Sequence, residues 1–381
     1  MNLCFLTHEF PKPGLNPGGV GVFLQAYLHE LVKAGCKVTV LGANNSNDFE
    51  DTTINGVRII RIPNHKFPGI NWFFLAKGLN QKLREIHEET PLDIVEGSEL
   101  AFAFLKKPKG IKFIIRLHGG HHFFAESENR KIQFWKGFQE KRSFKNADAF
   151  IAVSDYVRVH TGKLLNFHNR PIKKIRYGID IHKFNYSPRS LNSNPHSLVF
   201  VGTVCEKKGV ENLVLAIDQV KKNFPNVQLD IYGKDWFYPN GDSYKDMIRK
   251  KIKGDLESHI KIHDPVSHEK IPDIYKSAEI CIFPSFMETQ GLVAPEAMAM
   301  GKIVIFTDKG PGPETIQSGI NGFLCNPLKV SSIVETIEEA FNSLERKNEI
   351  SLAARTFVEQ NFGFHIVLKE NLSFYNQVIN G

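Results

Sequence analysis

The chain has 381 residues, of which 42% are hydrophobic and 23% are charged. This composition is ordinary for a globular protein, and the length predicts two or three domains. No stretch approaches the ~18 to 20 uninterrupted apolar residues of a spanning helix, and the first residues lack the basic region and apolar run of a signal peptide. We therefore expect a cytoplasmic protein. The five cysteines are scattered without a Cys-x-x-Cys pair, which favours small core residues over a disulfide framework or a zinc knuckle.

The net charge of +7 is divided unevenly along the chain. Residues 1–195 hold 28 Lys and Arg against 17 Asp and Glu, a balance of +11, whereas the remainder holds 20 against 24, a balance of −4. The basic side chains of the first half are spread over many segments, which is typical of a solvated surface. An anionic membrane surface is the other candidate partner for them. No module that binds nucleic acid is present, so nucleic acid is not an expected partner.

Short apolar runs alternate with helical patterns in both halves, and this β-α-β rhythm predicts parallel sheets. In the first half the expected strands are 2–7, 37–42, 57–62, 93–96, 112–117, 148–153 and 174–177. The helical patterns between them are 20–33, 73–88, 131–144 and 155–165. The polar stretch 185–196 contains two prolines and interrupts the rhythm, which indicates an interdomain linker.

The rhythm restarts after this stretch, with strands expected at 197–204, 228–232, 260–262, 279–284, 302–307 and 322–325, and a last helix at 364–379. The sequence therefore predicts an α/β protein with two doubly wound, Rossmann-like domains that face a central cleft. We place the first domain at 1–185, the linker at 186–197 and the second domain at 198–362. Residues 363–381 are expected to form a helix that packs back on the first domain.

Both halves begin with a strand, a loop and a helix. In such an arrangement the backbone N–H groups at the start of the helix can bind an anion. In the first half the glycine-rich loop 16–23 contains Gly18 and Gly19, whose backbone N–H groups would meet a phosphate, unless the loop is only a flexible turn. The dinucleotide fingerprint is not met, because Leu24 stands where a third small residue is needed, and this argues against a nicotinamide enzyme. In the second half Lys207 and Lys208 would meet a phosphate or stay solvated.

Two carboxylates stand eight residues apart in the segment 284–301. Glu288 lies in the loop after an expected strand, and Glu296 falls on the helix expected from Gly291 to Met300. Their oxygens can accept hydrogen bonds from sugar hydroxyls, and Gly291 permits the backbone to approach a ligand closely. A capping Glu and a helix-surface Glu are the alternative interpretation.

The letters around these carboxylates, Gly-Leu-x-x-x-Glu-Ala-Met-Ala-x-Gly from Gly291 to Gly301, resemble the signature of retaining glycosyltransferases of family 4, which have the GT-B fold. The resemblance spans nearly the whole chain. Gly18-Gly19 is similar to the family's N-terminal phosphate loop. Further similar segments are the His-Gly turn at 116–119, the following strand at 151–154, the motif before the linker at 177–184 and the second phosphate loop at 201–209.

The resemblance implies a role for each matching residue. Glu288 would contact the donor sugar, Lys208 would neutralise the donor diphosphate, and His118 would contact a hydroxyl beside the reacting sugar. Glu296 would bind the ribose hydroxyls of the nucleotide. Further donor contacts are implied for Gly18, Gly19, Gly202, Thr203, Lys207, Gln290, Gly291 and Leu292. The implied reaction is front-face transfer with retention, in which the departing phosphate helps take the acceptor proton. No metal and no cofactor besides the nucleotide-sugar substrate are implied.

The sequence thus predicts a metal-independent hexosyltransferase that uses a UDP-sugar, or next a GDP-sugar, to modify a hydroxyl of a glycan, a lipid-linked glycan or a small molecule. Biosynthesis of polysaccharide or of cell envelope glycan is the expected setting. Phosphorolysis is disfavoured by the ribose role of Glu296. The chain departs from the family at Thr203, which replaces an Arg, at Gln290, which replaces an aromatic, and at Tyr177, which replaces an Asn. A catalytically weak or inactive sugar-nucleotide-binding partner of another transferase is therefore the alternative.

Two further clusters have more than one interpretation. His118, His121 and His122 are close in sequence, but no carboxylate or cysteine stands at a matching spacing, so no metal site is expected. His121 and His122 would line the acceptor side or face solvent. Aromatic and basic residues mix in the expected helix 131–144, where Phe134, Trp135 and Phe138 are expected in the core. Together with the segment 66–74, this helix is the candidate for peripheral contact with the inner face of a membrane.

Overall fold

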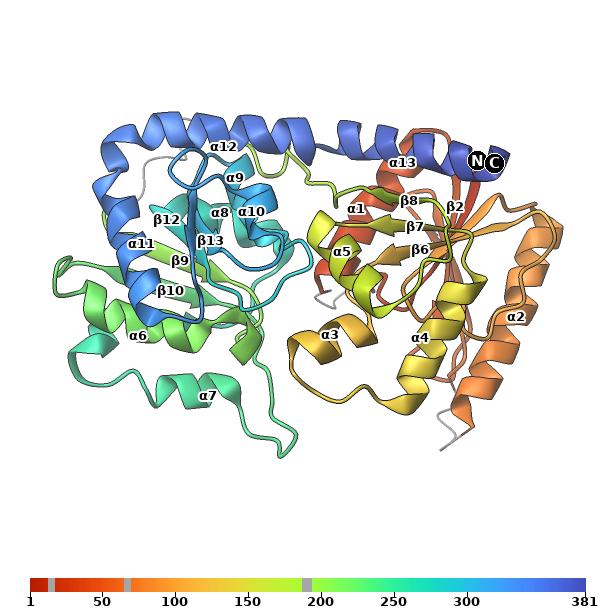
Figure 1. The fold of residues 1–381 in the computed structure, drawn as a ribbon, viewed down its shortest axis with the longest axis horizontal. Coiled ribbons are helices and arrows are strands. Elements are labelled where there is room, and N and C mark those ends of the chain that lie inside the picture. The colour runs from red at the N-terminus through yellow and green to blue at the C-terminus, as the bar shows by residue number, and fades with distance from the viewer. Residues whose placement is uncertain (13–17, 65–69, 187–193) are drawn as a thin grey trace. The chain divides into compact units, whose positions relative to one another are not determined.

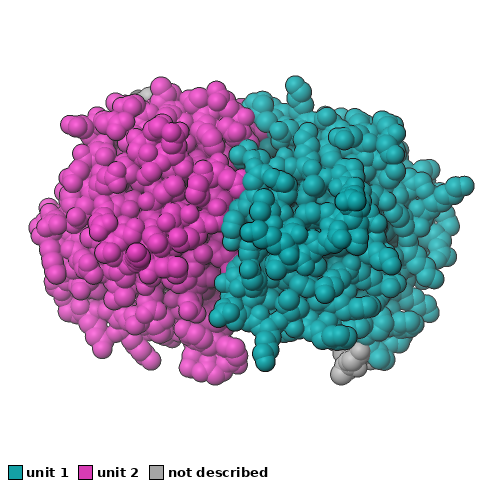
Figure 2. Space-filling view, viewed as in Figure 1, with its two compact units in different colours: residues 1–178, 364–381 teal, residues 179–363 magenta. Residues whose placement is uncertain are grey.

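The computed structural model describes residues 1–12, 18–64, 70–186 and 194–381. The chain divides into two compact units, which are residues 1–178 with 364–381 (unit 1) and residues 179–363 (unit 2) (Figure 2). The start of the glycine-rich loop at 16–17, the stretch 66–69 and most of the expected linker lie outside the described residues. The division between the units falls at Gly178, seven residues before the expected end of the first domain.

The described part of unit 1 contains an eight-stranded sheet with the order β3-β4-β2-β1-β5-β6-β7-β8 (Figure 1). Neighbouring strands are parallel except β3 and β4, which are antiparallel. The strands are β1 (Asn2–Leu6), β2 (Lys37–Ala43), β3 (Glu50–Ile54), β4 (Val57–Ile62), β5 (Ile94–Gly97), β6 (Lys112–Leu117), β7 (Ala149–Ala152) and β8 (Ile172–Lys174). Strands β1, β5, β6 and β7 are almost entirely buried, as the apolar runs in the sequence require.

Helices cover both faces of this sheet (Figure 1). They are α1 (Gly19–Lys33), α2 (Asn71–Glu89), α3 (His121–Ser127), α4 (Phe134–Asn146), α5 (Asp155–Leu164) and α13 (Phe364–Asn380). The last of them, α13, belongs to unit 1 and packs on α1, where the hydroxyls of Tyr27 and Tyr375 lie 3.1 Å apart. A segment from the end of the chain thereby completes the core of the first unit.

Unit 2 has, within its described residues, a six-stranded parallel sheet with the order β11-β10-β9-β12-β13-β14. The strands are β9 (Ser197–Val201), β10 (Gln228–Tyr232), β11 (Ile260–His263), β12 (Ile280–Phe283), β13 (Ile303–Thr307) and β14 (Phe323–Cys325). The α-helices are α6 (Val210–Val220), α7 (Tyr244–Arg249), α8 (Ile271–Ser277), α9 (Val293–Ala299), α10 (Gly312–Thr315), α11 (Val330–Asn342) and α12 (Lys347–Asn361). Short 3₁₀ helices are η2 (Glu206–Lys208), η3 (Gly254–Ser258), η4 (His268–Lys270) and η5 (Leu344–Arg346).

The strand orders of both sheets fix where a ligand can bind. In unit 2 the chain builds outward from β9 through β10 to β11 and then continues from β12 on the other side of β9. In unit 1 the same reversal separates β1 from β5. Ligands of doubly wound sheets bind beyond the carboxyl ends of the strands at such switch points. Ligand sites are therefore expected at the loops that follow β9 and β12 in unit 2 and β1 and β5 in unit 1.

Two expectations about local structure are wrong, and both have physical reasons. Strand β3 was not expected because four of its five residues are exposed, so it lacks the apolar run of a buried strand. The side chains of Phe134, Trp135 and Phe138 are exposed and not in the core. Helix α4 instead buries Gly137, Glu140, Ser143 and Phe144, and its first three residues, 134–136, are exposed. All five cysteines are buried and unpaired, as the sequence predicts.

Candidate active site

Two loops of unit 2 meet at the carboxyl ends of β9 and β12. The backbone N–H of Phe286, in the loop after β12, donates to the carbonyl oxygen of Lys207 in η2 over 2.8 Å. Gly209 ends η2 with φ of +70°, and a Cβ at this residue would lie 2.0 Å from the carbonyl oxygen of Pro284. Because only glycine permits both this φ and this contact, the two loops can pack backbone to backbone at the switch point.

Lys208 and Glu288 form an ion pair across these loops, from Lys208 Nζ to Glu288 Oε1. The hydroxyl of Ser285 donates to the same Oε1 over 2.8 Å. The exposed fraction of the side chain is 22% for Lys208 and 9% for Glu288, so the pair is poorly solvated and its charges interact more strongly than at an open surface. The structure thus brings together two of the three expected catalytic residues, at the switch point of unit 2.

Glu296 lies on α9 and is buried. Its Oε1 is 3.0 Å from Nε2 of His268, and its Oε2 is 3.5 Å from the hydroxyl of Tyr275. On the other side of the imidazole, His268 Nδ1 is 2.8 Å from Nζ of Lys183. A lysine ammonium can only donate, so Nδ1 accepts and Nε2 carries the proton that is donated to Glu296. This chain of polar contacts holds the Glu296 side chain in a fixed orientation.

The backbone at the start of α9 is also constrained by its surroundings. Gly291 has φ of +75°, and a Cβ there would lie 2.6 Å from the ring of Phe306. The preceding Gln290 is buried, and Leu292 forms the N-cap of α9. Position 291 therefore requires glycine for its own backbone, besides any need of a ligand.

The loop after β9 carries the remaining donor-binding residues expected in this unit. The N–H of Gly202 donates to the carbonyl of Tyr232 over 3.0 Å. Thr203 is half-buried, whereas Lys207 is exposed. The side chain of Lys208, the second of the two neighbouring lysines, lies against Glu288.

In unit 1, Gly18 and Gly19 mark the start of α1. Gly18 is the N-cap residue, and its carbonyl accepts a 3.0 Å hydrogen bond from the N–H of Val22. Among the described residues no side chain caps this end of the helix, and its first turn holds no acidic residue. An uncapped helix start with a glycine backbone is suited to an anion.

A buried ion pair precedes the expected site residue His118. Arg116 is fully buried, and its guanidinium donates to Glu96 Oε1 over 2.7 Å and to Glu96 Oε2 over 3.1 Å. It also donates to the Asn371 side chain on α13 over 2.6 Å. The hydroxyl of Tyr375 donates to Glu96 Oε2 over 2.5 Å. The pair therefore ties β5 and β6 to α13 immediately below the turn that carries His118.

His118 is hydrogen-bonded through Nδ1 to the hydroxyl of Tyr177, and the two rings stack with centroids 5.7 Å apart. Burial, with the nearby Arg116 charge as the second cause, lowers the pKa of His118 from 6.5 to about 3. The imidazole is therefore neutral throughout the physiological range. Tyr177 is a departure from the family sequence. It thus supports His118, for which the family resemblance implies a contact beside the reacting sugar.

The other two histidines of this turn are held by one buried carboxylate. Glu140 accepts from the backbone N–H of His121 over 2.8 Å and of His122 over 2.9 Å, and it pairs with Nδ1 of His122. His122 therefore does not face solvent, and both histidines are buried. Across the described ranges, no group of three or more His, Cys, Asp or Glu side chains is arranged to hold a metal ion.

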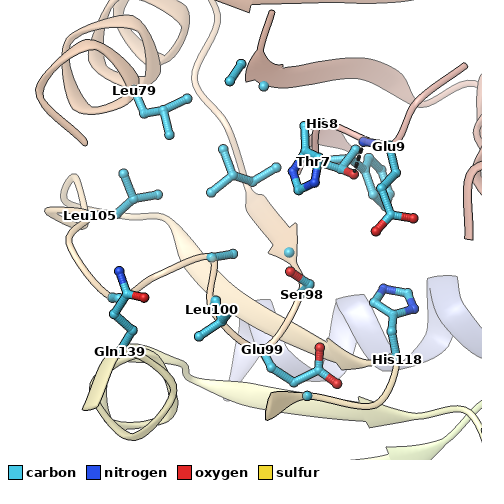
Figure 3. Close-up of a pocket in the computed structure, with 18 of the residues that line it drawn as sticks. Thr7, His8, Glu9, Leu79, Ser98, Glu99, Leu100, Leu105, His118 and Gln139 are labelled. Carbon is cyan, nitrogen blue, oxygen red and sulfur yellow. Dashed lines mark hydrogen bonds between the residues drawn. The ribbon is translucent and has the colours of Figure 1, made fainter. Parts of the chain in front are cut away.

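A pocket of about 540 Å³ lies within unit 1 at the switch point between β1 and β5 (Figure 3). Polar side chains from the loops after β1, β5 and β6 line one part of it, namely His8, Glu9, Ser98, Glu99 and His118. Apolar side chains, many of them from α2 and the loop after β5, line much of the rest, together with the polar His121, Lys136 and Gln139. Glu99 accepts from the N–H of Gly119 over 2.8 Å, so this carboxyl also positions the turn that contains His118.

The buried carboxyl of Glu99 leads to a prediction about how the stability of the protein depends on pH. Burial, followed by the nearby Glu140 charge, raises the pKa of Glu99 from 4.5 to about 8. The folded protein therefore favours the protonated carboxyl, and its stability should fall as the pH rises from the unfolded pKa toward about 8. Glu99→Gln keeps an acceptor for Gly119 but cannot ionise. We expect its melting temperature to match the parent near pH ~5 and to exceed it near pH ~8.

The control for this prediction is Glu88→Gln, an exposed carboxyl on α2. Melting temperatures of the three proteins across the same pH range give the comparison. If Glu99→Gln and the parent lose stability in parallel as the pH rises, Glu99 is not the group that titrates.

Both units are matched by models of glycosyltransferase families. Residues 17–183 match the family described as Glycosyltransferase Family 4, and residues 184–357 match Glycosyl transferases group 1. Among solved structures, sucrose-phosphate synthase from Thermosynechococcus elongatus has a TM-score of 0.85 at 18% identity, covering 100% of this chain and 99% of that one. Anabaena HepE in complex with UDP-glucose has a TM-score of 0.78 at 18% identity, covering 99% and 100%. The fold is thus GT-B.

Curated relatives match over their whole length as well. Spore coat protein SA of Bacillus subtilis is 22% identical over 391 residues, covering 97% of this chain and 98% of the relative. Glycogen synthase of Mycobacterium tuberculosis is 23% identical over 406 residues, covering 98% and 94%. With both family models matched in succession, the chain belongs to the group 1 glycosyltransferases. No helix in the described residues is long and apolar enough to cross a membrane.

Several site residues were not predicted from the sequence. Ser285, whose hydroxyl donates to Glu288, stands three residues before it in the loop after β12. This short spacing is the sequence feature that could have identified it. His268 and Glu99 lie outside every motif, and only the fold brings them to Glu296 and to Gly119. Tyr177 was noted only as a departure from the family sequence.

Proposed function

We propose that this protein is a retaining, metal-independent glycosyltransferase that takes a hexosyl group from a nucleoside diphosphate sugar, with UDP-sugar favoured over GDP-sugar. The observation that carries the proposal is the Lys208–Glu288 pair at the switch point of unit 2, with Glu296 held by His268 on the helix that follows. The HepE structure that shares this fold holds UDP-glucose, which supports the choice of uridine. A hydroxyl on a glycan, a lipid-linked glycan or a small molecule is the proposed acceptor.

In unit 2 each group has a distinct proposed task. Lys208 exchanges its contact with Glu288 for the donor diphosphate, and the amides of Gly291 and Leu292 support the same charge. Glu288, released from Lys208 but still bonded to Ser285, accepts a hydrogen bond from the donor sugar. Glu296 accepts from the ribose hydroxyls. Positive charge and amides placed before the reaction stabilise the leaving phosphate, which takes the acceptor proton.

In unit 1 the proposed tasks fall on α1 and on the turn after β6. The amides of Gly18 and Gly19 add to the neutralisation of the donor phosphate. His118 is neutral and uses Nδ1 for Tyr177, so Nε2 is the ring atom that would contact a sugar hydroxyl. The pocket beside His118 is the proposed acceptor site. We place the protein in the cytoplasm, peripheral to the inner face of the membrane.

The second candidate function is a sugar-nucleotide-binding partner with little or no activity. Thr203 favours it, because the family's usual Arg would add a charge-assisted contact to the diphosphate, worth about 1.5–3 kcal/mol. The exposed Lys207 is the nearest cation of the same loop that could replace that charge.

The test is release of free nucleotide from UDP-, GDP-, ADP- and dTDP-sugars, each with and without a chelator and paired with a calorimetric binding assay. We expect release from a UDP-sugar that a chelator does not change. Lys208→Met should weaken nucleotide binding, whereas Lys250→Met, an exposed lysine after α7, should not. Tight binding without release in the presence of an acceptor panel would favour the inactive partner. No binding of any donor would overturn the proposal.

A further inference from the structure

Exposed aromatic side chains gather at the first turns of α2 and α4 in unit 1. The exposed fraction is 53% for Phe73 and 85% for Phe134, values far above those of core aromatic residues. We call this set the aromatic surface: Trp72, Phe73, Phe74, Phe134, Trp135 and Phe138. A folded protein leaves so many large rings in water only where something else covers them.

Ring contacts join five members of the aromatic surface although they come from two helices, and the sixth, Phe134, precedes Trp135 in α4. Trp72 and Trp135 contact each other with centroids 5.3 Å apart, and Phe104 packs against both at 4.7 Å and 5.7 Å. Trp135 also stacks on Phe138 at 5.8 Å. The first turns of α2 and α4 lie at the same edge of unit 1 (Figure 1). Most rings of the aromatic surface therefore contact one another and are not isolated exposed side chains.

Basic residues are frequent in the segment that carries the α4 part of the aromatic surface, although the first of them, Arg130, is paired with Glu128. Residues 130–146 contain six Lys and Arg, and their single acidic residue is the buried Glu140. Lys136 stands between Trp135 and Phe138 and is exposed, as is Lys77 one turn after Phe74. Lysine is depleted at the cores of protein interfaces, but it is attracted to anionic lipid headgroups beside rings that enter the interface. The combination favours an anionic bilayer over a protein partner.

The aromatic surface continues into the pocket of unit 1. Trp72 belongs to both. Phe104, which packs against the two tryptophans, and Lys136, the residue after Trp135, also line the pocket. From there the walls are mainly apolar and include Leu79 and Leu105. Figure 3 shows Leu79, Leu105 and Gln139 on one side of the pocket, and His8, Glu9 and His118 on the other. The pocket thus has a mainly apolar end toward the aromatic surface, where Gln139 and Lys136 are the polar exceptions, and a polar end at His118.

We propose that the aromatic surface rests on an anionic lipid bilayer and that the pocket receives the apolar part of an amphiphilic acceptor, whose hydroxyl lies at the His118 end. This inference rests on the proposed function and names its acceptor class. A bilayer supplies such an acceptor directly beside the apolar entrance. Lys and Arg around the rings hold the surface to anionic headgroups while the rings enter the interface.

Vesicle sedimentation tests the surface. The parent should bind vesicles of phosphatidylcholine with about 30% phosphatidylglycerol, bind pure phosphatidylcholine weakly, and lose binding as salt is raised to about 0.5 M. Phe73→Ser/Phe134→Ser should lower binding about 10-fold or more, because two interfacial rings are lost. The matched control is Leu328→Ser/Leu352→Ser, which replaces two apolar residues of unit 2 that are 64% and 59% exposed. Equal binding by both double variants, or no binding to anionic vesicles at low salt, would overturn the proposal.

A second measurement tests the pocket itself. Octyl glucoside below its critical micelle concentration should quench tryptophan fluorescence and bind at least about 10-fold more tightly than glucose, because its chain enters the apolar end. Leu79→Trp, which fills that end, should abolish this difference but leave vesicle binding intact. Equal affinity for the glucoside and for glucose would overturn the acceptor assignment. UDP binding is measured on every variant, so a protein that binds UDP but neither vesicles nor glucoside disproves this inference and leaves the proposed function standing.

Discussion

Glu288→Gln is expected to reduce turnover by about 100-fold or more and to change the affinity for free nucleotide by less than about threefold. The amide keeps the size of the side chain and an oxygen that can accept from Ser285 Oγ, now 2.8 Å from Oε1. It removes the charge that faces Lys208 and the proposed contact with the donor sugar. Lys208 then remains available to the diphosphate, so nucleotide binding survives. Single-turnover kinetics with the preferred donor and calorimetry with the nucleotide separate the two effects.

Glu335→Gln supplies the control, since it makes the same chemical change on the exposed face of α11 in the same unit. It should leave both turnover and affinity unchanged. If Glu288→Gln lost turnover and nucleotide affinity to the same extent, the carboxylate would have a structural role in holding the two loops together. Unchanged turnover would remove Glu288 from the reaction.

Much of the fold could be predicted because the spacing of apolar residues along the sequence shows which residues of a strand or helix are buried. The strands Val57–Ile62, Lys112–Leu117 and Gln228–Tyr232 match the expected ranges residue for residue. Strand β3 was missed because an exposed edge strand has no apolar run. A local signal for it exists in Asn55-Gly56, whose φ angles of 51° and 81° make a tight turn into β4.

The polar contacts of the site were harder to predict than its motif residues. Lys208, Glu288 and Glu296 stand in segments that resemble a family signature. Their partners do not, since His268 meets Glu296 across 28 positions and Tyr177 meets His118 across 59. Such contacts follow from how helices and loops pack at the strand ends, which no local pattern encodes.

The exposure of the aromatic surface could not be predicted from the sequence for a different reason. A stripe of apolar residues on a helix predicts a buried face but not where along the helix the burial begins. In α4 the burial begins at Gly137, so Phe134 and Trp135, which precede it, remain exposed. The sequence favours the core for these rings and offers membrane contact as the alternative, and their exposure in the structure excludes the core.

Arg116→Met is expected to reduce the free energy of unfolding of unit 1 by about 3–5 kcal/mol, the usual cost of breaking a buried ion pair. Methionine fills a similar volume but leaves the Glu96 carboxylate, which is 3% exposed, without its cation. The substitution also removes the 2.6 Å bond from β6 to Asn371 on α13. Urea unfolding followed by circular dichroism measures the loss. Arg84→Met, an exposed arginine on α2, is the matched control and should have little effect.

The double variant Arg116→Met/Glu96→Leu distinguishes the cost of an unpaired charge from the loss of packing. Replacing both members of a buried pair by apolar residues is often close to neutral, so the double variant should recover most of the stability that Arg116→Met loses. Recovery should be incomplete, because the Tyr375 hydroxyl and the Asn371 side chain each lose a partner in this cluster. If the double variant is no more stable than Arg116→Met, the stability of unit 1 depends on the hydrogen bonds that join the sheet to α13 and not on neutralisation of Glu96.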